Sequence, residues 1–242
     1  MKIWDRIVDA ATRLAGGEPI GLLLGSSAPT ADDGQHPGLR QIAFTIGVIA
    51  LGAKMAGADG EVSDSELQAF REFFQVPPGE ENNVERFFNL AKRDVAGFEV
   101  YAKQVAALFP DAPEILENVL EGLFEIAKAD GAVDAAEADY LAKVARLFGL
   151  DSNRFERAKA AALGVIECEP CIILGIDPLA TDEQIREAWL RQVRANHPDR
   201  LIAQGLPEEA IQVANRKLAL INDAYDRLRR QRGLAAAPAP AA

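Results

Sequence analysis

The stretch Asn196-His197-Pro198-Asp199-Arg200 interrupts a C-terminal region whose apolar spacing is otherwise that of helices. Residues 185–193 place apolar side chains on one helical face, and residues 211–228 repeat the pattern at steps of three and four. The proline fixes its own φ and disfavours helical geometry at the histidine, so the first helix must end about there. We expect the aspartate to fold its carboxylate onto nearby backbone donors. The pattern predicts an antiparallel helical hairpin with His-Pro-Asp at an exposed turn, where a partner would bind.

Two further features belong to this predicted hairpin. Thr181 and Gln184 have the spacing of a capping box that starts the first long helix. Arg191 and Arg194 lie one turn apart, away from the apolar face, and with Arg200 beyond the turn they predict a small positive ridge. The expected core consists of the apolar residues at helical spacing: Leu174, Ile185, Trp189, Val193, Ile211, Leu218, Ile221, Tyr225 and Leu228.

Four separated elements of this region resemble a J domain, the module by which DnaJ-type co-chaperones engage DnaK-type (seventy-kilodalton heat-shock) chaperones. They are residues 171–178, residues 181–189, the tripeptide His197-Pro198-Asp199 and residues 221–225, in that order. Residues 201–209 resemble, more specifically, the DjlA branch of these co-chaperones. The resemblance rests on the order of the four elements and not on the tripeptide alone.

The resemblance implies a DnaK-type chaperone as the partner, whose ATPase domain presents a negative surface to the positive ridge. It also implies that the tripeptide bears on the contacts that couple ATP hydrolysis to substrate capture, while the partner supplies the nucleotide site and the catalytic groups. Two positions depart from the common pattern. Leu190 stands where another basic residue is common, and Asn196 stands where an aromatic or basic residue often precedes the histidine. The ridge is therefore thinner than is usual in the family.

An internal repeat organises the acidic part of the chain. Residues 58–66, Ala-Asp-Gly-Glu-Val-Ser-Asp-Ser-Glu, recur as residues 129–137, Ala-Asp-Gly-Ala-Val-Asp-Ala-Ala-Glu. In each copy the glycine predicts the end of one helix, and a capping pair, Asp134 with Glu137 in the second copy, predicts the start of the next. Apolar spacing predicts helices near 39–57, 63–75, 80–95, 98–109, 113–129, 135–148 and 152–163.

This duplicated pattern in an all-helical acidic region resembles TerB, the module named for tellurite-resistance proteins, which precedes the J domain in DjlA-like chains. The resemblance implies a divalent-metal site built from acidic side chains, for which Asp59, Glu66, Asp130 and Glu137 are the candidates. Neither copy has the regular oxygen-ligand spacing of a calcium loop, and capping accounts for the glutamates without a metal. Capping is therefore the favoured interpretation, so we expect no cofactor, with a divalent metal at this module as the alternative.

The charge distribution argues against nucleic-acid binding. The chain of 242 residues carries a net charge of −11, and residues 39–167 contain 22 acidic and 13 basic residues. Residues 168–232, by contrast, contain ten of each. Nonspecific nucleic-acid binding needs an excess of lysine and arginine that displaces counterions, and this acidic body lacks it.

The sequence shows no pattern of an enzyme or a redox centre. Because no Gly-x-Ser-x-Gly, phosphate-binding loop or paired-histidine motif occurs, we expect a protein that is not an enzyme. Cys168 and Cys171 form a CxxC pair, but without the strand of a thioredoxin-like setting or the further ligands that zinc needs. We expect Cys171 to pack at the start of a helix. Few cysteines and no signal peptide are consistent with a cytoplasmic location.

Residues 1–25 have the pattern of an amphipathic helix followed by a brief apolar run. Charged residues and a proline interrupt the stretch, so we do not expect it to span a membrane. DjlA-like proteins are typically anchored at this end, so the chain departs from that family here. Two alternatives stay open, packing of the segment on the body and peripheral contact with a membrane.

Together these patterns predict an all-α protein. A TerB-like helical bundle at residues 39–165 precedes a J-domain-like hairpin at 168–233, with a linker at 26–38 and a disordered Ala/Pro tail at 234–242. The predicted function is a co-chaperone that stimulates a DnaK-type ATPase, while the bundle binds a client or a stress-pathway protein. The alternative is a metal-responsive TerB-type sensor or scaffold whose J-like hairpin is vestigial.

Overall fold

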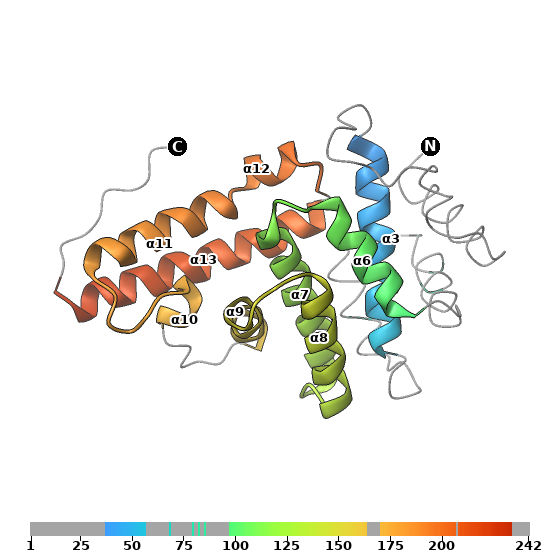
Figure 1. The fold of residues 1–242 in the computed structure, drawn as a ribbon, viewed down its shortest axis with the longest axis horizontal. Helices are drawn as coiled ribbons and strands as arrows, with labels where there is room; N and C mark the ends of the chain where they lie inside the picture. The colour runs from blue at the N-terminus through green and yellow to red at the C-terminus, as the bar shows by residue number, and fades with distance from the viewer. Residues whose placement is uncertain are drawn as a thin grey trace.

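The computed structural model describes residues 37–56, 97–163, 170–206 and 208–233, together with the single residues 68, 79, 82 and 85. The regular elements within these ranges are all helices, which confirms the predicted all-α class (Figure 1). Their bounds are α3 Pro37–Ala56, α6 Phe98–Leu108, α7 Pro113–Ala127, η1 Lys128–Asp130, α8 Ala135–Leu147, α9 Ser152–Leu163, α10 Pro170–Leu174, α11 Asp182–Ala195, α12 Pro198–Ala203 and α13 Glu208–Gln231.

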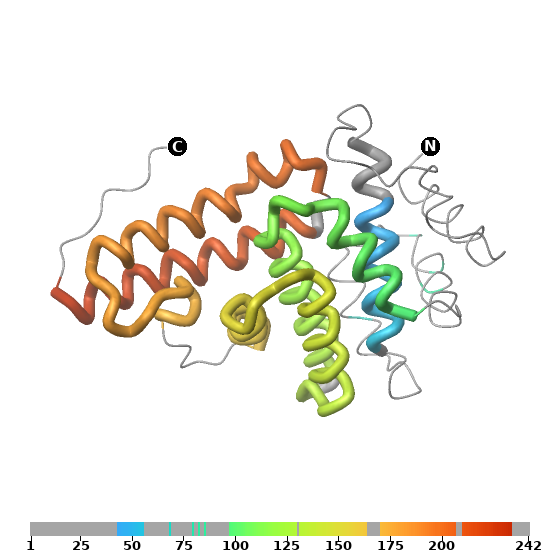
Figure 2. The backbone as a smooth tube through the Cα atoms, viewed as in Figure 1, coloured from blue at the N-terminus to red at the C-terminus, as the bar shows by residue number. Residues whose placement is uncertain are grey.

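Helix α7 is the centre of the body, the bundle formed by α3, α6, α7, α8 and α9. Every residue from Ile115 to Phe124 is buried, because α3, α8, α9 and α13 all pack against this one helix. A helix that is buried on all sides is the core element of its bundle. Helices α3 and α6 lie side by side at one end of the body (Figure 2).

The second copy of the repeat forms the turn that its sequence predicts. Helix α7 continues through η1 to Gly131, whose φ of 136° lies in the region that favours glycine. Helix α8 then begins with a capping box, in which Asp134 N donates to Glu137 Oε2 at 2.9 Å and Glu137 N donates to Asp134 Oδ1 at 2.8 Å. The capping prediction for this copy is confirmed, and the first copy lies outside the described residues.

Helices α11 and α13 form the predicted antiparallel hairpin, with α10 packed against α13 (Figure 1). The capping box of α11 is present, with bonds of 3.2 Å from Gln184 N to Thr181 Oγ1 and 2.8 Å from Thr181 N to Gln184 Oε1. Trp189 packs in the hairpin core as expected. Its ring stacks on Tyr225 at 4.4 Å between centroids, and its Nε1 donates to Asn222 Oδ1 at 2.9 Å.

The apolar face of α13 serves two different cores. Its C-terminal part, including Ile221 and Leu228, packs in the hairpin core, whereas Ala210 and Ala214 are buried in the core of the body. Ile211 packs against the body as well, so its assignment to the hairpin core was wrong. The reason is length: α13 has 24 residues and α11 only 14, so the first turns of α13 extend beyond the hairpin.

Five of the predicted helices of the acidic region correspond to α3, α6, α7, α8 and α9 within a few residues. Those near 63–75 and 80–95 lie almost wholly outside the described residues, as do segment 1–25 and tail 234–242. Helix α3 begins at Pro37, inside the predicted linker. Cys171 is buried in α10 as expected, and Cys168 is not described. None of the described helices combines the length and the apolar character that crossing a bilayer requires.

Candidate functional site

The tripeptide forms a tight turn between α11 and α12. Helix α11 ends at Ala195, as predicted, and His197 is the N-cap residue of α12 with φ −67° and ψ 130°. The imidazole Nδ1 accepts a hydrogen bond from Asp199 N at 3.3 Å, and Pro198 fills the first helical position, where no N–H is needed. The expectation that the Asp199 carboxylate caps this turn was wrong. The imidazole does so, because the histidine occupies the N-cap position.

The turn is accessible from one side. The side chain of His197 is 48% exposed and that of Asp199 is 85% exposed. Arg191 and Arg194 are exposed on α11, as expected for the positive ridge. Arg200 differs, because its guanidinium lies 2.6 Å from Glu114 Oε1 at the start of α7. The ridge therefore consists of two exposed arginines on α11 and a third that pairs with the body.

The other side of the turn packs on the body. The turn lies at the end of the hairpin that meets α7, and not at a free tip (Figure 1). Leu201 and Leu206, which flank the end of α12, are buried in the core of the body. Asn196, directly before the histidine, is fully buried, and its Oδ1 accepts a hydrogen bond from Asn118 Nδ2 at 3.1 Å. The tripeptide is thus the exposed part of a junction, the region in which Asn196, the turn and α12 pack on the body.

A buried polar cluster, formed by Glu117, Asn118, Glu121, Arg157 and Lys217, joins α7, α9 and α13 beside this junction. Lys217 Nζ donates to Glu117 Oε1 at 2.8 Å and to Asn118 Oδ1 at 3.0 Å. Arg157 donates to both oxygens of Glu117 through two bonds of 2.8 Å each. Glu121 Oε2 lies 3.3 Å from Lys217 Nζ, within ion-pair range, but it has no hydrogen-bond partner among the described residues. The contact is therefore a Coulombic one without a well-aligned hydrogen bond.

The two glutamates of the cluster have opposite pKa shifts. Burial raises the pKa of Glu117, but Lys217 and Arg157 outweigh this effect and lower the pKa to about 2. Burial raises the pKa of Glu121 to about 7, since Lys217 offsets it only in part and the charges of Glu125 and Glu117 add repulsion. Glu117 is therefore ionised at neutral pH, whereas Glu121 exchanges a proton near neutral pH.

The buried polar cluster was missed in the sequence, although two signals for it exist. Lys217 stands between Ala214 and Ile221 on the apolar face of the last helix, at a position where a lysine side chain would be buried. Glu117 and Glu121 lie four residues apart in a segment that is otherwise rich in apolar residues, on the same helical face as Glu114, Asn118 and Glu125. Buried charges are stable only when they are paired, so each signal implied a partner of opposite charge. Neither signal identified that partner.

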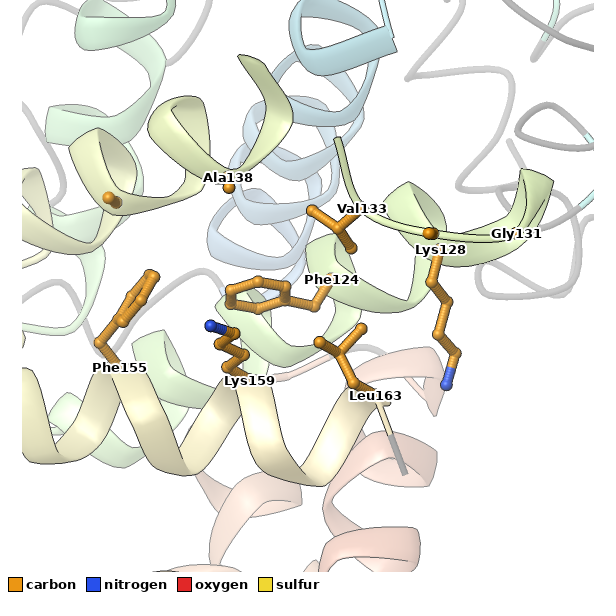
Figure 3. A pocket seen from close by; sticks show the side chains of 10 residues that line it. Phe124, Lys128, Gly131, Val133, Ala138, Phe155, Lys159 and Leu163 are labelled. Carbon is orange, nitrogen blue, oxygen red and sulfur yellow. The ribbon is translucent and has the colours of Figure 1, made fainter. Parts of the chain in front are cut away.

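A cleft of about 540 Å³ lies between α7, α8 and α9, next to the second copy of the repeat (Figure 3). Its wall is mainly apolar and includes Phe124 and Phe155. Lys128 and Lys159 also line it. Lys128 Nζ donates to the carbonyl of Ala162, whereas Lys159 is exposed and has no ion-pair partner among the described residues. The lining suits an apolar group that carries a negative charge at its end.

The candidate metal ligands are only partly described. Glu137 is engaged in the capping box of α8, which occupies one of its carboxylate oxygens. Asp59, Glu66 and the side chain of Asp130 lie outside the described part of the chain. Within that part, no three His, Cys, Asp or Glu side chains gather in a way that could hold a metal ion. Among the four candidates, only the side chain of Glu137 is described, and it already takes part in a helix cap.

Comparison with known proteins gives a family match and several relatives. Residues 45–160 match the model of the family described as tellurite resistance protein TerB. The chain is 32% identical to co-chaperone protein DjlA of Shewanella oneidensis over 134 residues, 50% of this chain and 51% of that protein, so that alignment spans only about half of the relative. It is 26% identical to DjlA of Coxiella burnetii over 74% of each chain. It is 24% identical to DjlA of Photobacterium profundum over 80% of this chain and 79% of that protein. No solved structure matches.

Proposed function

We propose that this DjlA-like chain acts as a co-chaperone and stimulates ATP hydrolysis by a DnaK-type chaperone. The proposal starts from its TerB match and its similarity to DjlA co-chaperones. The observation that carries the proposal is the His197-Pro198-Asp199 turn. Its histidine and aspartate side chains are open to solvent, while Asn196 before it and Leu201 at the second position after it are buried. A partner would meet polar groups on a preorganised backbone, which lowers the entropic cost of recognition.

Arg191 and Arg194 would orient the encounter. Both are exposed on α11, the helix that leads into the turn, and so can face a negative surface while the turn makes its own contacts. Charge complementarity of this kind speeds association and selects the orientation more than it adds affinity. The chain itself would supply no catalytic group, because the nucleotide and the residues that hydrolyse it belong to the partner.

The test is single-turnover ATP hydrolysis by the DnaK-type chaperone of the same organism, with the native chain and with its His197→Gln variant. We expect the native chain to accelerate hydrolysis and the variant to have no effect. His36→Gln is the matched control, since His36 is the only other histidine and also precedes a proline, but no aspartate follows it. An equal loss in both variants, or no acceleration by the native chain, would contradict the proposal.

A second comparison separates the role of the two arginines in the encounter with the partner from a role in the stimulation of ATP hydrolysis itself. Replacing Arg191 and Arg194 by alanine should raise the partner concentration for half-maximal stimulation on the order of tenfold and leave the maximal rate unchanged. The effect should shrink as the salt concentration rises, because mobile ions already screen the attraction between exposed charges. A loss of maximal rate at saturating partner would assign these arginines a different role.

The body would recruit the client or stress-pathway protein, and the cleft beside the second repeat is the candidate contact. An apolar peptide with acidic residues fits its phenylalanine lining and the exposed Lys159. Fluorescence polarisation with a labelled Leu/Phe/Asp peptide should show binding that Lys159→Glu weakens. A peptide with Lys in place of Asp is the matched control and should bind more weakly to the native chain. Equal binding of both peptides would argue against this contact.

The competing proposal is a metal-responsive sensor, in which the acidic repeat is primary and the hairpin is vestigial. Acidic residues at both repeat turns support it, and the engagement of Glu137 in a helix cap counts against it. Thermal unfolding with and without calcium, magnesium or zinc distinguishes the two proposals. A metal-dependent rise in Tm that is lost on replacing Asp59 and Asp130 would favour the sensor.

A further inference from the structure

We infer that Asn118 and Lys217 are positioning residues, through which the TerB-like body sets the orientation of the His197-Pro198-Asp199 turn via Asn196. The inference rests on the proposed function, because it describes how the turn is presented to the partner. It goes beyond that function by making the body part of the mechanism. The J-like hairpin would then depend on the body for its activity and not only for recruitment.

The first step of the argument is a continuous chain of hydrogen bonds. Lys217 Nζ on α13 donates to Asn118 Oδ1 at 3.0 Å, and Asn118 Nδ2 on α7 donates to Asn196 Oδ1 at 3.1 Å. Asn196 is bonded by its backbone to His197, which caps α12. The chain therefore runs from the hairpin through the body and back to the residue that precedes the tripeptide.

The second step is that each link is fixed. Asn118, Asn196 and Lys217 are each at most 4% exposed, so none of them can exchange its partner for water without local opening. Asn196 Nδ2 also donates to the Gln192 carbonyl at 2.9 Å. Both the nitrogen and the oxygen of the Asn196 side-chain amide are therefore hydrogen-bonded, which fixes the orientation of the amide. A buried amide with both ends bonded has one favourable orientation, and a lost bond leaves an unsatisfied group.

The third step is the anchoring of the cluster in the body. Arg157 of α9 holds Glu117 through two hydrogen bonds, and Glu117 accepts from Lys217 at 2.8 Å. The body thus fixes the ammonium of Lys217. After the turn, Leu201 is buried in the core of the body. The tripeptide is bracketed by two attachments to the body, one polar before it and one apolar after it.

A positioning role differs from a purely structural one in what it changes. Arg191 and Arg194 are exposed on α11 and take no part in the bond between Asn118 and Asn196, so we expect the initial encounter with the partner not to require this bond. The presentation of the histidine does require it. Breaking the bond should lower the maximal stimulated rate and leave the half-saturating partner concentration unchanged.

The first test needs no partner and uses the imidazole of His197 as the reporter. In a His36→Gln background the chain has a single histidine, so its Cε1–H and Cδ2–H proton resonances are unambiguous. Asn118→Ala and Asn196→Ala remove the same hydrogen bond from opposite ends, and both should shift or broaden these resonances. Arg216→Ala is the matched control. Arg216 lies beside Lys217 on α13 and makes an exposed pair with Glu125, so its loss should leave the histidine resonances unchanged. Unchanged resonances in both asparagine variants would overturn the inference.

Both variants should remain folded. Each substitution removes the hydrogen bonds of a single side-chain amide and leaves the apolar cores of the body and the hairpin intact. A cooperative melt by circular dichroism checks this. A variant that does not melt cooperatively is replaced by Asn118→Ser, which removes the amide donor toward Asn196 with a smaller loss of polarity.

The second test is single-turnover ATP hydrolysis with the full chain and the DnaK-type chaperone over a range of concentrations. Asn118→Ala and Asn196→Ala should lower the maximal rate roughly tenfold with the half-saturating concentration retained, because a misplaced contact loses its effect while binding persists. Arg216→Ala should match the native chain. Full maximal rates in both asparagine variants, beside an inactive His197→Gln, would overturn the inference and leave the proposed function intact. No stimulation by the native chain would overturn both.

Discussion

Replacing Lys217 by methionine tests the buried polar cluster most severely. Methionine keeps an unbranched side chain of similar length but has no ammonium. The ammonium contacts Glu117 and Asn118 through hydrogen bonds of 2.8 and 3.0 Å and lies 3.3 Å from Glu121. Lys217 itself is only 3% exposed, so water cannot take the place of the lost group.

The cost follows from what the variant leaves behind. Glu117 keeps its two bonds to Arg157, but Glu121 loses the only cation in contact with it in the described part of the chain, and the carbonyl of Asn118 loses a donor. Breaking a buried ion pair by removing one partner costs about 3–5 kcal/mol. We therefore expect the free energy of unfolding to fall by that amount at pH 7.5.

Urea denaturation at pH 7.5 and 5.0, followed by circular dichroism, measures the effect. Because the stranded Glu121 must be protonated in the folded variant, the loss should be smaller at pH 5.0, where protonation is less costly. Adding Glu121→Gln should restore part of the stability at pH 7.5. Arg216→Met is the control, since its exposed pair with Glu125 contributes about 0–1 kcal/mol. A cost for Lys217→Met no larger than that of the control would refute the reasoning.

Three further outcomes are expected. The raised pKa of Glu121, about 7 against 4.5, means that the folded chain retains a proton that the unfolded chain has released. Stability of the native chain should therefore fall as the pH rises from about 4.5 to 7, by an amount on the order of 3 kcal/mol, and denaturation of Glu121→Gln should show no such fall. Asp134→Ala removes the capping box of α8 and should cost about 1 kcal/mol by chemical denaturation, and a cost near zero would contradict its role. Gly175→Ala should cost at least about 1 kcal/mol, because the residue has φ 67° and an added Cβ would collide with the guanidinium of Arg157, and an unchanged Tm would contradict this packing.

The local features of the fold could be predicted because each depends on residues close in the sequence. Pro198 ended α11, Thr181 with Gln184 and Asp134 with Glu137 began two helices, and apolar spacing placed Trp189 in a core. All of these follow from backbone geometry and periodicity within about two turns of helix.

The junction could not be predicted because it joins residues that are far apart. Asn118 and Asn196 are 78 residues apart, and no local pattern indicates that two neutral amides meet. The apolar spacing of α13 predicted a helix correctly. It did not indicate that the first turns of this helix pack on the body and the later turns in the hairpin, so Ile211 was assigned to the wrong core. The imidazole of His197 caps the turn in place of the Asp199 carboxylate because His197 occupies the N-cap position, which the sequence pattern did not specify.

Hydrogen–deuterium exchange of the full chain, alone and with the DnaK-type chaperone in the presence of ATP, tests the central claim most directly. It locates the surface that the partner covers without any substitution in the chain. The account predicts slower amide exchange across residues 191–200, at the end of α11 and in the turn, and unchanged exchange around the cleft of α7, α8 and α9. Slower exchange confined to the cleft, or no change anywhere, would contradict the claim that the turn is the site at which this protein engages its partner.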